Sequence, residues 1–222
     1  MSEERDVCVN TESGSPEAEN MPVTDISMAG MEELQVVYVV RHCKAEGQEA
    51  AARLTPEGWR QAERLASLLA PFSIERVVAS PFARAVKTIE PFCRRMNLEL
   101  TTDARLAERR LSGAQLPDWM RCLEQTFEDA DLRYPGGETS REAADRAVSA
   151  IDDLLGLKIR GAVVVTHGNL MALLLGHYDN RIGFEQWKRL TNPDVYRLTF
   201  HSGRFQSMER IEGVYRAVKT DH

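Results

Sequence analysis

Short apolar runs alternate along the chain with longer amphipathic segments, and this alternation restricts the fold more than any other feature. The runs "LQVVYVV" (34–40) and "AVVVTHG" (162–168) are apolar almost throughout and rich in β-branched residues, as expected of strands buried on both faces. "ERVVAS" (75–80) and "LELT" (98–101) indicate two further strands. Strand–helix alternation is typical of α/β proteins. We therefore predict a three-layer α/β sandwich with a largely parallel central sheet and helices on both faces.

Two of the amphipathic segments begin with clear helix signals. Thr55 can cap a helix whose first position is taken by Pro56. Thr139 and Glu142 have the spacing of a capping box at the start of another helix. In the first helix we expect Trp59 on the buried face, together with Ala62, Leu65, Ala66 and Leu69.

The remaining segments complete this plan. Helices are expected from Pro81 to about Met96 and from about Asn169 onward, and "LPDWMRCLEQTFEDA" (116–130) is helix-like. "VYRLTF" and "FQSMERI" alternate in character, which favours an antiparallel strand pair at one edge of the sheet.

The first 34 residues differ in composition from the rest, with nine carboxylate residues against a single arginine. High net charge with few apolar residues is typical of disorder. We predict a disordered acidic tail over 1–34, with an acidic docking arm as the alternative, and one α/β domain over 35–222. Met28 or Met31 could equally be the start. A signal peptide's basic start and apolar segment are absent, so a cytoplasmic location is predicted.

Several classes of protein do not fit the composition. No apolar run approaches the roughly 20 residues of a membrane span, so no membrane association is expected. The chain beyond the tail is nearly neutral and its arginines are dispersed, which argues against a nucleic-acid partner. The four cysteines and five histidines lack metal-type spacing, so we predict reduced thiols, no metal and no cofactor. The oligomeric state is left open.

Basic and polar residues stand at the carboxyl ends of three predicted strands. The first strand ends in Arg41 and His42. The second ends at Ser80, with Arg84 one turn into the next helix, and a later strand leads to His167. Ligands of open α/β sheets bind beyond the carboxyl ends of the strands. If these strands are parallel neighbours, two arginines and two histidines converge there.

Such a group of residues suits phosphate chemistry. Guanidinium groups bind phosphate oxygens bidentately and keep their charge, and a helix N-terminus adds N–H donors for an anion. One imidazole can attack phosphorus and hold the phosphoryl group, while another donates a hydrogen bond to the developing charge. Each residue alone is more often an ordinary core or surface residue, but their joint position at strand ends favours an anion site.

The sequence motifs occur in the order seen in one known family. "VRHCKAEGQ", "LTPEGWRQAERLASLL", "VVASPFARAVKTIEPF", "LAERR", "YPGGETSREAADRA" and "VVVTHGNLMALLL" resemble the histidine phosphatase superfamily, in its phosphoglycerate-mutase-like branch. The resemblance covers roughly residues 36–175. It implies a phosphoric monoester hydrolase that acts on a small-molecule phosphate ester without a cofactor.

The resemblance also implies roles for five residues. His42 would be the nucleophile that becomes phosphohistidine. Arg41, Arg84 and His167 would hold the phosphoryl group. Glu108 would protonate the leaving oxygen and then deprotonate the hydrolytic water.

Three further residues are expected at the substrate: Gln48, Gly168 and Arg109. Gln48 stands where the family often has Asn, so it keeps the amide donor on a longer side chain. Arg109, with Arg110, could bind a second anionic group, and ordinary loop arginines are the equal alternative. Cys43 replaces the usual Gly after the Arg-His pair, and we favour core filling over a narrowed pocket.

Two other functions remain open. A mutase would need segments that close over the site, and the stretch between Arg110 and Tyr134 is short, so hydrolysis is favoured. A non-catalytic phospho-ligand binder is suggested only by the departures at Cys43 and Gln48. The substrate itself is left open, because specificity is expected to lie in residues 109–137.

Overall fold

The computed structural model describes residues 34–213. The strands are β1 (Leu34–Arg41), β2 (Arg76–Ala79), β3 (Leu100–Thr102), β4 (Gly161–Thr166), β5 (Asp194–His201) and β6 (Arg204–Arg210). The helices are α1 (Pro56–Leu69), α2 (Ala83–Met96), α3 (Trp119–Glu128), α4 (Ser140–Gly156), α5 (Gly168–Tyr178) and α6 (Phe184–Arg189), with a 3-10 turn at Ala104–Leu106.

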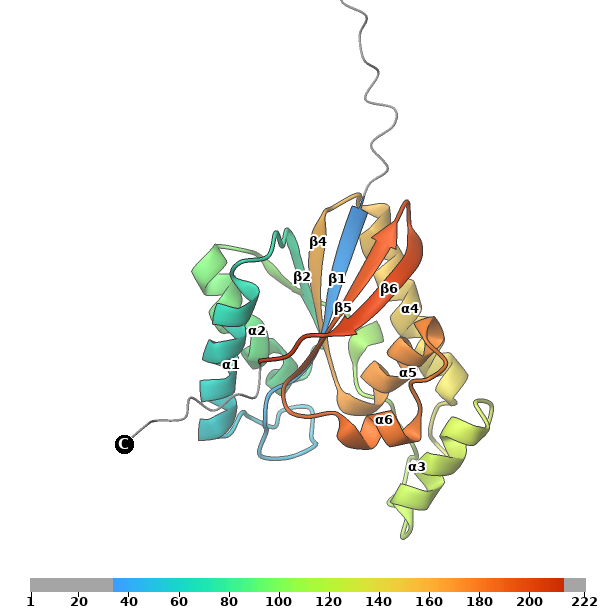
Figure 1. The fold of residues 1–222 in the computed structure, drawn as a ribbon. Coiled ribbons are helices and arrows are strands. Elements are labelled where there is room, and N and C mark those ends of the chain that lie inside the picture. The colour runs from blue at the N-terminus through green and yellow to red at the C-terminus, as the bar shows by residue number, and fades with distance from the viewer. Residues whose placement is uncertain (1–33, 214–222) are drawn as a thin grey trace, which may run out of the picture. The chain divides into compact units, whose positions relative to one another are not determined.

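The six strands form one mixed sheet in the order β3-β2-β4-β1-β5-β6. The first four of these pair in parallel, and β5 and β6 add an antiparallel edge beside β1. Figure 1 shows α1 and α2 on one side of the sheet and α4 and α5 on the other. The predicted sandwich, with its largely parallel sheet and antiparallel edge, is confirmed.

Alternating residues of β1 build two separate cores. Val37 and Val39 pack with the core under α4 and α5, whereas Tyr38 and Val40 pack with the core under α1 and α2. All residues of β4 are buried. Strands covered on both faces must be apolar on both faces, which is why these runs show no polar alternation.

Both helix-start predictions are confirmed. The Thr55 hydroxyl accepts a hydrogen bond from the Gly58 N–H at 3.0 Å, and Thr139 and Glu142 form a reciprocal capping box. The prediction for Trp59 is wrong, because its side chain is 40% exposed. The first turn of α1 lies against the chain at Lys44, where a Cβ on Gly58 would come within 2.0 Å of the Lys44 oxygen. The residue buried in this turn is therefore Gly58, and the neighbouring indole lies at the surface.

The acidic tail lies outside the described residues, apart from Leu34, which begins β1. Its disorder, the single domain over 35–222 and the cytoplasmic location therefore stay predictions. Within residues 34–213, no helix combines the length and apolar character that crossing a bilayer requires.

Candidate active site

Three parallel strands deliver the predicted site residues to one crevice. β2, β4 and β1 are neighbours, and their register aligns Arg41 with Thr166 at the carboxyl end of the sheet. Beyond these ends, the His42 and His167 rings lie 5.1 Å apart, centroid to centroid. The Arg84 Nε lies 3.1 Å from the His42 Nε2. The condition set by the sequence, that these strands be parallel neighbours, is met.

His42 is buried and held in one tautomer. Its Nδ1 lies 2.7 Å from the Cys43 carbonyl oxygen, and a carbonyl only accepts, so Nδ1 carries the proton. The Nε2 then presents a lone pair, which accepts from Arg84. Burial, followed by the charges of Arg84 and Arg41, lowers the pKa of His42 to about 3, against the opposing bond to Cys43. The imidazole is therefore neutral at pH 7, as a nitrogen nucleophile must be.

Arg84 is almost fully buried and joins His42 to the loop that follows β1. Its Nη1 donates to the carbonyl oxygens of Gln48 at 3.0 Å and Glu49 at 2.8 Å. Its guanidinium lies 4.9 Å from the centroid of the Phe82 ring. Burial lowers the pKa of Arg84, yet a guanidinium stays charged at neutral pH. A fixed positive charge thus stands beside the His42 nitrogen.

His167 is fully buried and is oriented by Ser80. Its Nε2 lies 2.7 Å from the Ser80 hydroxyl oxygen, which already accepts from the Phe82 N–H at 3.3 Å. When the hydroxyl donates its proton to Nε2, the His167 proton stands on Nδ1. That Nδ1 is buried and has no hydrogen-bond partner in the described chain. Burial lowers the pKa of His167 to about 2, so the ring is a neutral donor.

The hydrogen bond between the Phe82 N–H and the Ser80 hydroxyl explains why α2 begins later than predicted. We expected α2 to open at Pro81, whereas it begins at Ala83. The Phe82 N–H is taken by the Ser80 hydroxyl instead of adding a helical turn. This placement brings the Phe82 ring to 4.9 Å from the His167 ring.

Arg41 passes close over the start of α5. A Cβ on Gly168 would lie 2.9 Å from the Arg41 Cζ, so Gly168 leaves room for the guanidinium. The Arg41 Nη1 donates to the Leu190 oxygen at 2.8 Å, and the Asn192 amide donates to the His42 oxygen at 2.7 Å. The segment between α6 and β5 therefore holds both members of the Arg-His pair. No sequence pattern in this segment indicates such a role.

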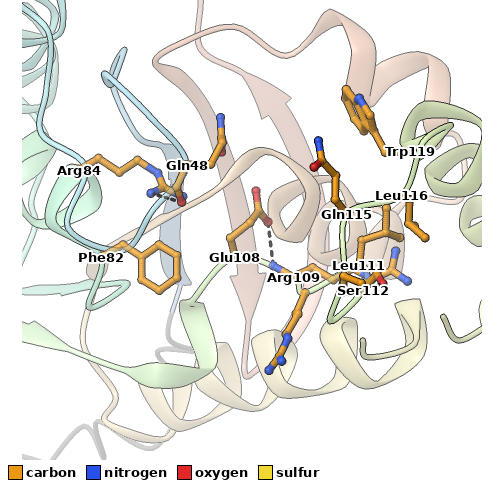
Figure 2. Close-up of a pocket in the computed structure, with 12 residues that line it drawn as sticks. Gln48, Phe82, Arg84, Glu108, Arg109, Leu111, Ser112, Gln115, Leu116 and Trp119 are labelled. Carbon is orange, nitrogen blue, oxygen red and sulfur yellow. Dashed lines mark hydrogen bonds between the residues drawn. The ribbon is translucent and has the colours of Figure 1, made fainter. Parts of the chain in front are cut away.

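Glu108 stands at the N-terminus of α5. Its carboxylate accepts hydrogen bonds from the N–H groups of Arg109 at 2.9 Å, Leu170 at 3.0 Å and Asn169 at 3.3 Å. It lines a cavity of about 550 Å³ together with Arg84 and Gln48. Figure 2 shows the Glu108 carboxylate pointing into this cavity. A carboxyl group therefore lines the same pocket as Arg84, the hydrogen-bond partner of His42.

Arg109 lines both cavities beside the site, but its guanidinium is engaged inside the fold. Its guanidinium donates to the Thr126 hydroxyl at 2.7 Å and to the Glu138 carbonyl oxygen at 3.1 Å. In Figure 2 its side chain turns away from the cavity. A nearly buried guanidinium needs acceptors, and these two internal groups supply them. The exposed Arg110 is the arginine of this pair whose side chain stays at the surface.

Cys43 fills core space, in line with the favoured interpretation. It is fully buried and packs with Leu54 and Ala62, and burial raises the pKa of its thiol to about 12. Its N–H donates to the Thr88 hydroxyl at 2.8 Å. Among residues 34–213 there is no group of three or more His, Cys, Asp or Glu side chains placed to hold a metal ion.

The two depressed histidine pKa values predict acid sensitivity of the fold. Both histidines stay neutral in the fold down to about pH 3 or below, whereas in the unfolded chain they take up protons near pH 6.5. The free energy of unfolding should therefore fall as the pH falls from about 6.5 toward 3. Each histidine adds a slope of up to about 1.4 kcal/mol per pH unit.

Urea unfolding between pH 7 and pH 4.5 measures this slope. The variant His42→Ala should show a slope shallower than that of the wild type by about one histidine's share, up to ~1.4 kcal/mol per pH unit. The variant His177→Ala, at an exposed histidine, should retain the wild-type slope. Equal slopes in all three proteins would contradict the expected neutral state of His42.

The chain matches one protein family over most of its length. The model of the histidine phosphatase superfamily (branch 1) matches residues 37–211. The protein named "Probable phosphoglycerate mutase GpmB" of Salmonella choleraesuis is 25% identical over 192 residues, which cover 76% of this chain and 86% of the relative.

Solved structures agree on the fold. The mycobacterial glucosyl-3-phosphoglycerate phosphatase superposes with a TM-score of 0.65 at 22% identity, over 80% of this chain and 97% of the other. The phosphoglycerate mutase of Bacillus anthracis has a TM-score of 0.65 at 16% identity, over 82% and 95%. The relatives are thus named both as phosphatases and as mutases.

Proposed function

The chain belongs to the histidine phosphatase superfamily, and from this membership we propose that it is a phosphomonoesterase that works through a phosphohistidine on His42. The observation that carries the proposal is the state of His42. Its neutral ring presents the Nε2 lone pair 3.1 Å from the buried Arg84 guanidinium, and Arg84 lines a pocket that Glu108 also lines. A nucleophile (His42), a phosphate-binding cation (Arg84) and a group that can transfer a proton (Glu108) therefore lie close together.

The first half of the reaction follows from this geometry. The His42 Nε2 attacks phosphorus, the bond between phosphorus and the ester oxygen breaks, and that oxygen takes up a proton through the Glu108 carboxyl group. Arg84 transfers its Nε–H bond from His42 to a phosphate oxygen. Arg41 and the His167 Nδ1–H hold the remaining oxygens as their charge changes.

The second half regenerates the site. A water molecule attacks the phosphohistidine, and the Glu108 carboxylate takes one of its protons. The bond between phosphorus and Nε2 breaks, inorganic phosphate leaves, and His42 is again neutral. No metal or cofactor is required by these steps.

Access of water favours hydrolysis over transfer to an organic acceptor. Between Arg110 and Tyr134 the described chain has only the helix α3, and Trp119 at its start is 49% exposed. The mutase hypothesis rests on the names of relatives. The hypothesis of a non-catalytic phospho-ligand binder is supported by Gln48 alone, because Cys43 lies in the core.

Trapping the phosphoenzyme tests the proposal. The full chain is mixed with a ³²P-labelled aryl phosphate and quenched in alkali, in which phosphohistidine survives, and phosphate release is measured with and without excess glycerol. We expect labelled protein and free phosphate, with little label on glycerol. Transfer mainly to glycerol would favour the mutase reading. Binding of inorganic phosphate without any turnover on a broad ester panel would favour the binder.

A further inference from the structure

Apolar side chains form one wall of the cleft next to the site, on the side where the leaving group would lie. Two cavities of about 550 and 420 Å³ share Glu108, Gln48 and Trp119 among their lining residues, so they are two lobes of one cleft. Beyond Glu108 one wall of the cleft carries the apolar side chains of Leu111, Leu116, Trp119, Leu123 and Trp187. The polar residues Arg110, Ser112, Gln115 and Asn169 also line the cleft. Because Glu108 is the proposed proton donor, the leaving group must lie along this wall.

A series of packed rings fixes Trp119 in place. Its ring lies 6.4 Å from that of Trp187, nearly perpendicular at 87°. Trp187 stacks on Phe184 at 5.4 Å, and Phe184 lies 5.9 Å from Phe127, which packs against the main core. Figure 1 shows the parent helices α3 and α6 near each other below the sheet. The exposed half of the Trp119 indole is therefore a positioned surface and not a loose side chain.

The loop that carries Leu111 is equally well anchored. The Gly113 N–H donates to the Pro135 oxygen at 2.8 Å. A Cβ on Gly137 would come within 2.2 Å of the Leu111 oxygen, so glycine is needed for this close approach. Residues of the "YPGGET" motif thus hold the loop that carries Leu111 in place. Figure 2 shows Leu111, Leu116 and Trp119 grouped on one side of the cavity.

The chemistry of the lining indicates which leaving group fits. Glu108 is the only acidic residue among those that line the two lobes, and the Arg109 guanidinium is engaged elsewhere. A three-carbon leaving group would leave most of a cleft of several hundred Å³ to water. A flat ring, in contrast, could stack on the exposed indole and displace that water.

Resting on the proposed function, we propose that Trp119 is a specificity residue that selects phosphomonoesters whose leaving group carries a flat ring. The ring packs on the Trp119 indole while the ester oxygen lies at Glu108. Ring-bearing alcohols are then the preferred products besides inorganic phosphate.

Three esters of primary alcohols isolate the effect of the ring. We would compare kcat/KM for 2-phenylethyl, 2-cyclohexylethyl and n-propyl phosphate, whose leaving groups have similar intrinsic reactivity. The wild type should favour the phenyl ester over the propyl ester by about tenfold or more, with the cyclohexyl ester between them. Trp119→Ala should remove most of this preference through KM and leave the propyl ester nearly unchanged. Trp119→Phe should retain much of it.

Trp59→Ala is the matched control, because that indole is 40% exposed on α1, a helix that contributes no residue to the cleft lining. It should leave all three values unchanged. Equal kcat/KM for the three esters in wild type, or a ring preference that survives Trp119→Ala, would overturn the inference while leaving the phosphatase intact. A stronger preference for O-phosphoserine than for the phenyl ester would also overturn it, in favour of an anion contact at Arg110.

Binding measurements test this inference separately from the proposed reaction. The affinities of His42→Ala for phenylethyl and propyl phosphate can be measured by calorimetry even if no ester is turned over. A ring preference in binding that disappears in the double variant with Trp119→Ala would support the wall independently of catalysis. Equal affinities for the two esters would overturn it.

Discussion

Replacing His42 with alanine is expected to abolish phosphate release, with a loss of kcat of roughly 10³- to 10⁶-fold, as for other covalent nucleophiles. The His42 Nε2 presents its lone pair beside the Arg84 guanidinium, whereas the His167 Nε2 is engaged with the Ser80 hydroxyl. Without it, Arg84 and His167 can still bind the ester but cannot accept the phosphoryl group. Initial rates on an aryl phosphate and the amount of alkali-stable label measure both losses.

The fold should survive this substitution. In the variant, Arg84 keeps its bonds to the Gln48 and Glu49 carbonyl oxygens, so the loop after β1 remains attached. Circular dichroism and inorganic-phosphate affinity should therefore stay close to wild type, and His177→Ala should have full activity. Labelled phosphoenzyme in His42→Ala would show that another residue is the nucleophile.

The convergence of this site could be predicted from sequence because its main residues lie next to strands. An apolar run fixes where β1 and β4 end, and parallel pairing then brings the next residues together, which places His42 beside His167. Local signals such as the Thr55 cap act within a few residues, so they too can be recognised in the sequence. The fold class follows from these local signals. The meeting of the two histidines with Arg84 also requires the parallel pairing of neighbouring strands.

Other features depend on contacts that no local pattern encodes. Trp59 has the spacing of a core residue, but it is 40% exposed, next to Gly58 where the backbone of Lys44 packs against α1. Arg109 follows the predicted proton donor, yet its guanidinium finds acceptors inside the fold. The Leu190 carbonyl that holds Arg41 carries no sequence signal at all, because every residue has a carbonyl group. Trp119 lay within the stretch assigned to specificity, but its role needed the partner rings on α6.

Replacing Arg84 is expected to have the second largest effect. Arg84→Ala removes a buried cation that holds the His42 Nε2 in the free enzyme and would move to the phosphate on binding. Loss of one such donor to a developing charge typically lowers the rate by about 10²- to 10³-fold. Arg84→Lys keeps the charge, but one ammonium cannot reach both the loop carbonyls and His42 as the forked guanidinium does. We expect a smaller loss in the lysine variant and weaker inhibition by inorganic phosphate in both variants.

The pH profile distinguishes an electrostatic role of Arg84 from a purely structural one. After burial, the Arg84 charge is the largest of the causes that lower the pKa of His42 to about 3. Removing this charge raises that pKa, so the acid limb of kcat/KM should move toward neutral pH in Arg84→Ala and stay near its wild-type position in Arg84→Lys. Using one ester throughout keeps the ionisation of the substrate constant, and Arg94→Ala, an exposed arginine on the same helix, should match wild type. If the acid limb is unmoved while both Arg84 variants lose activity equally, Arg84 serves only to tether the loop. Its charge would then have no part in keeping His42 neutral.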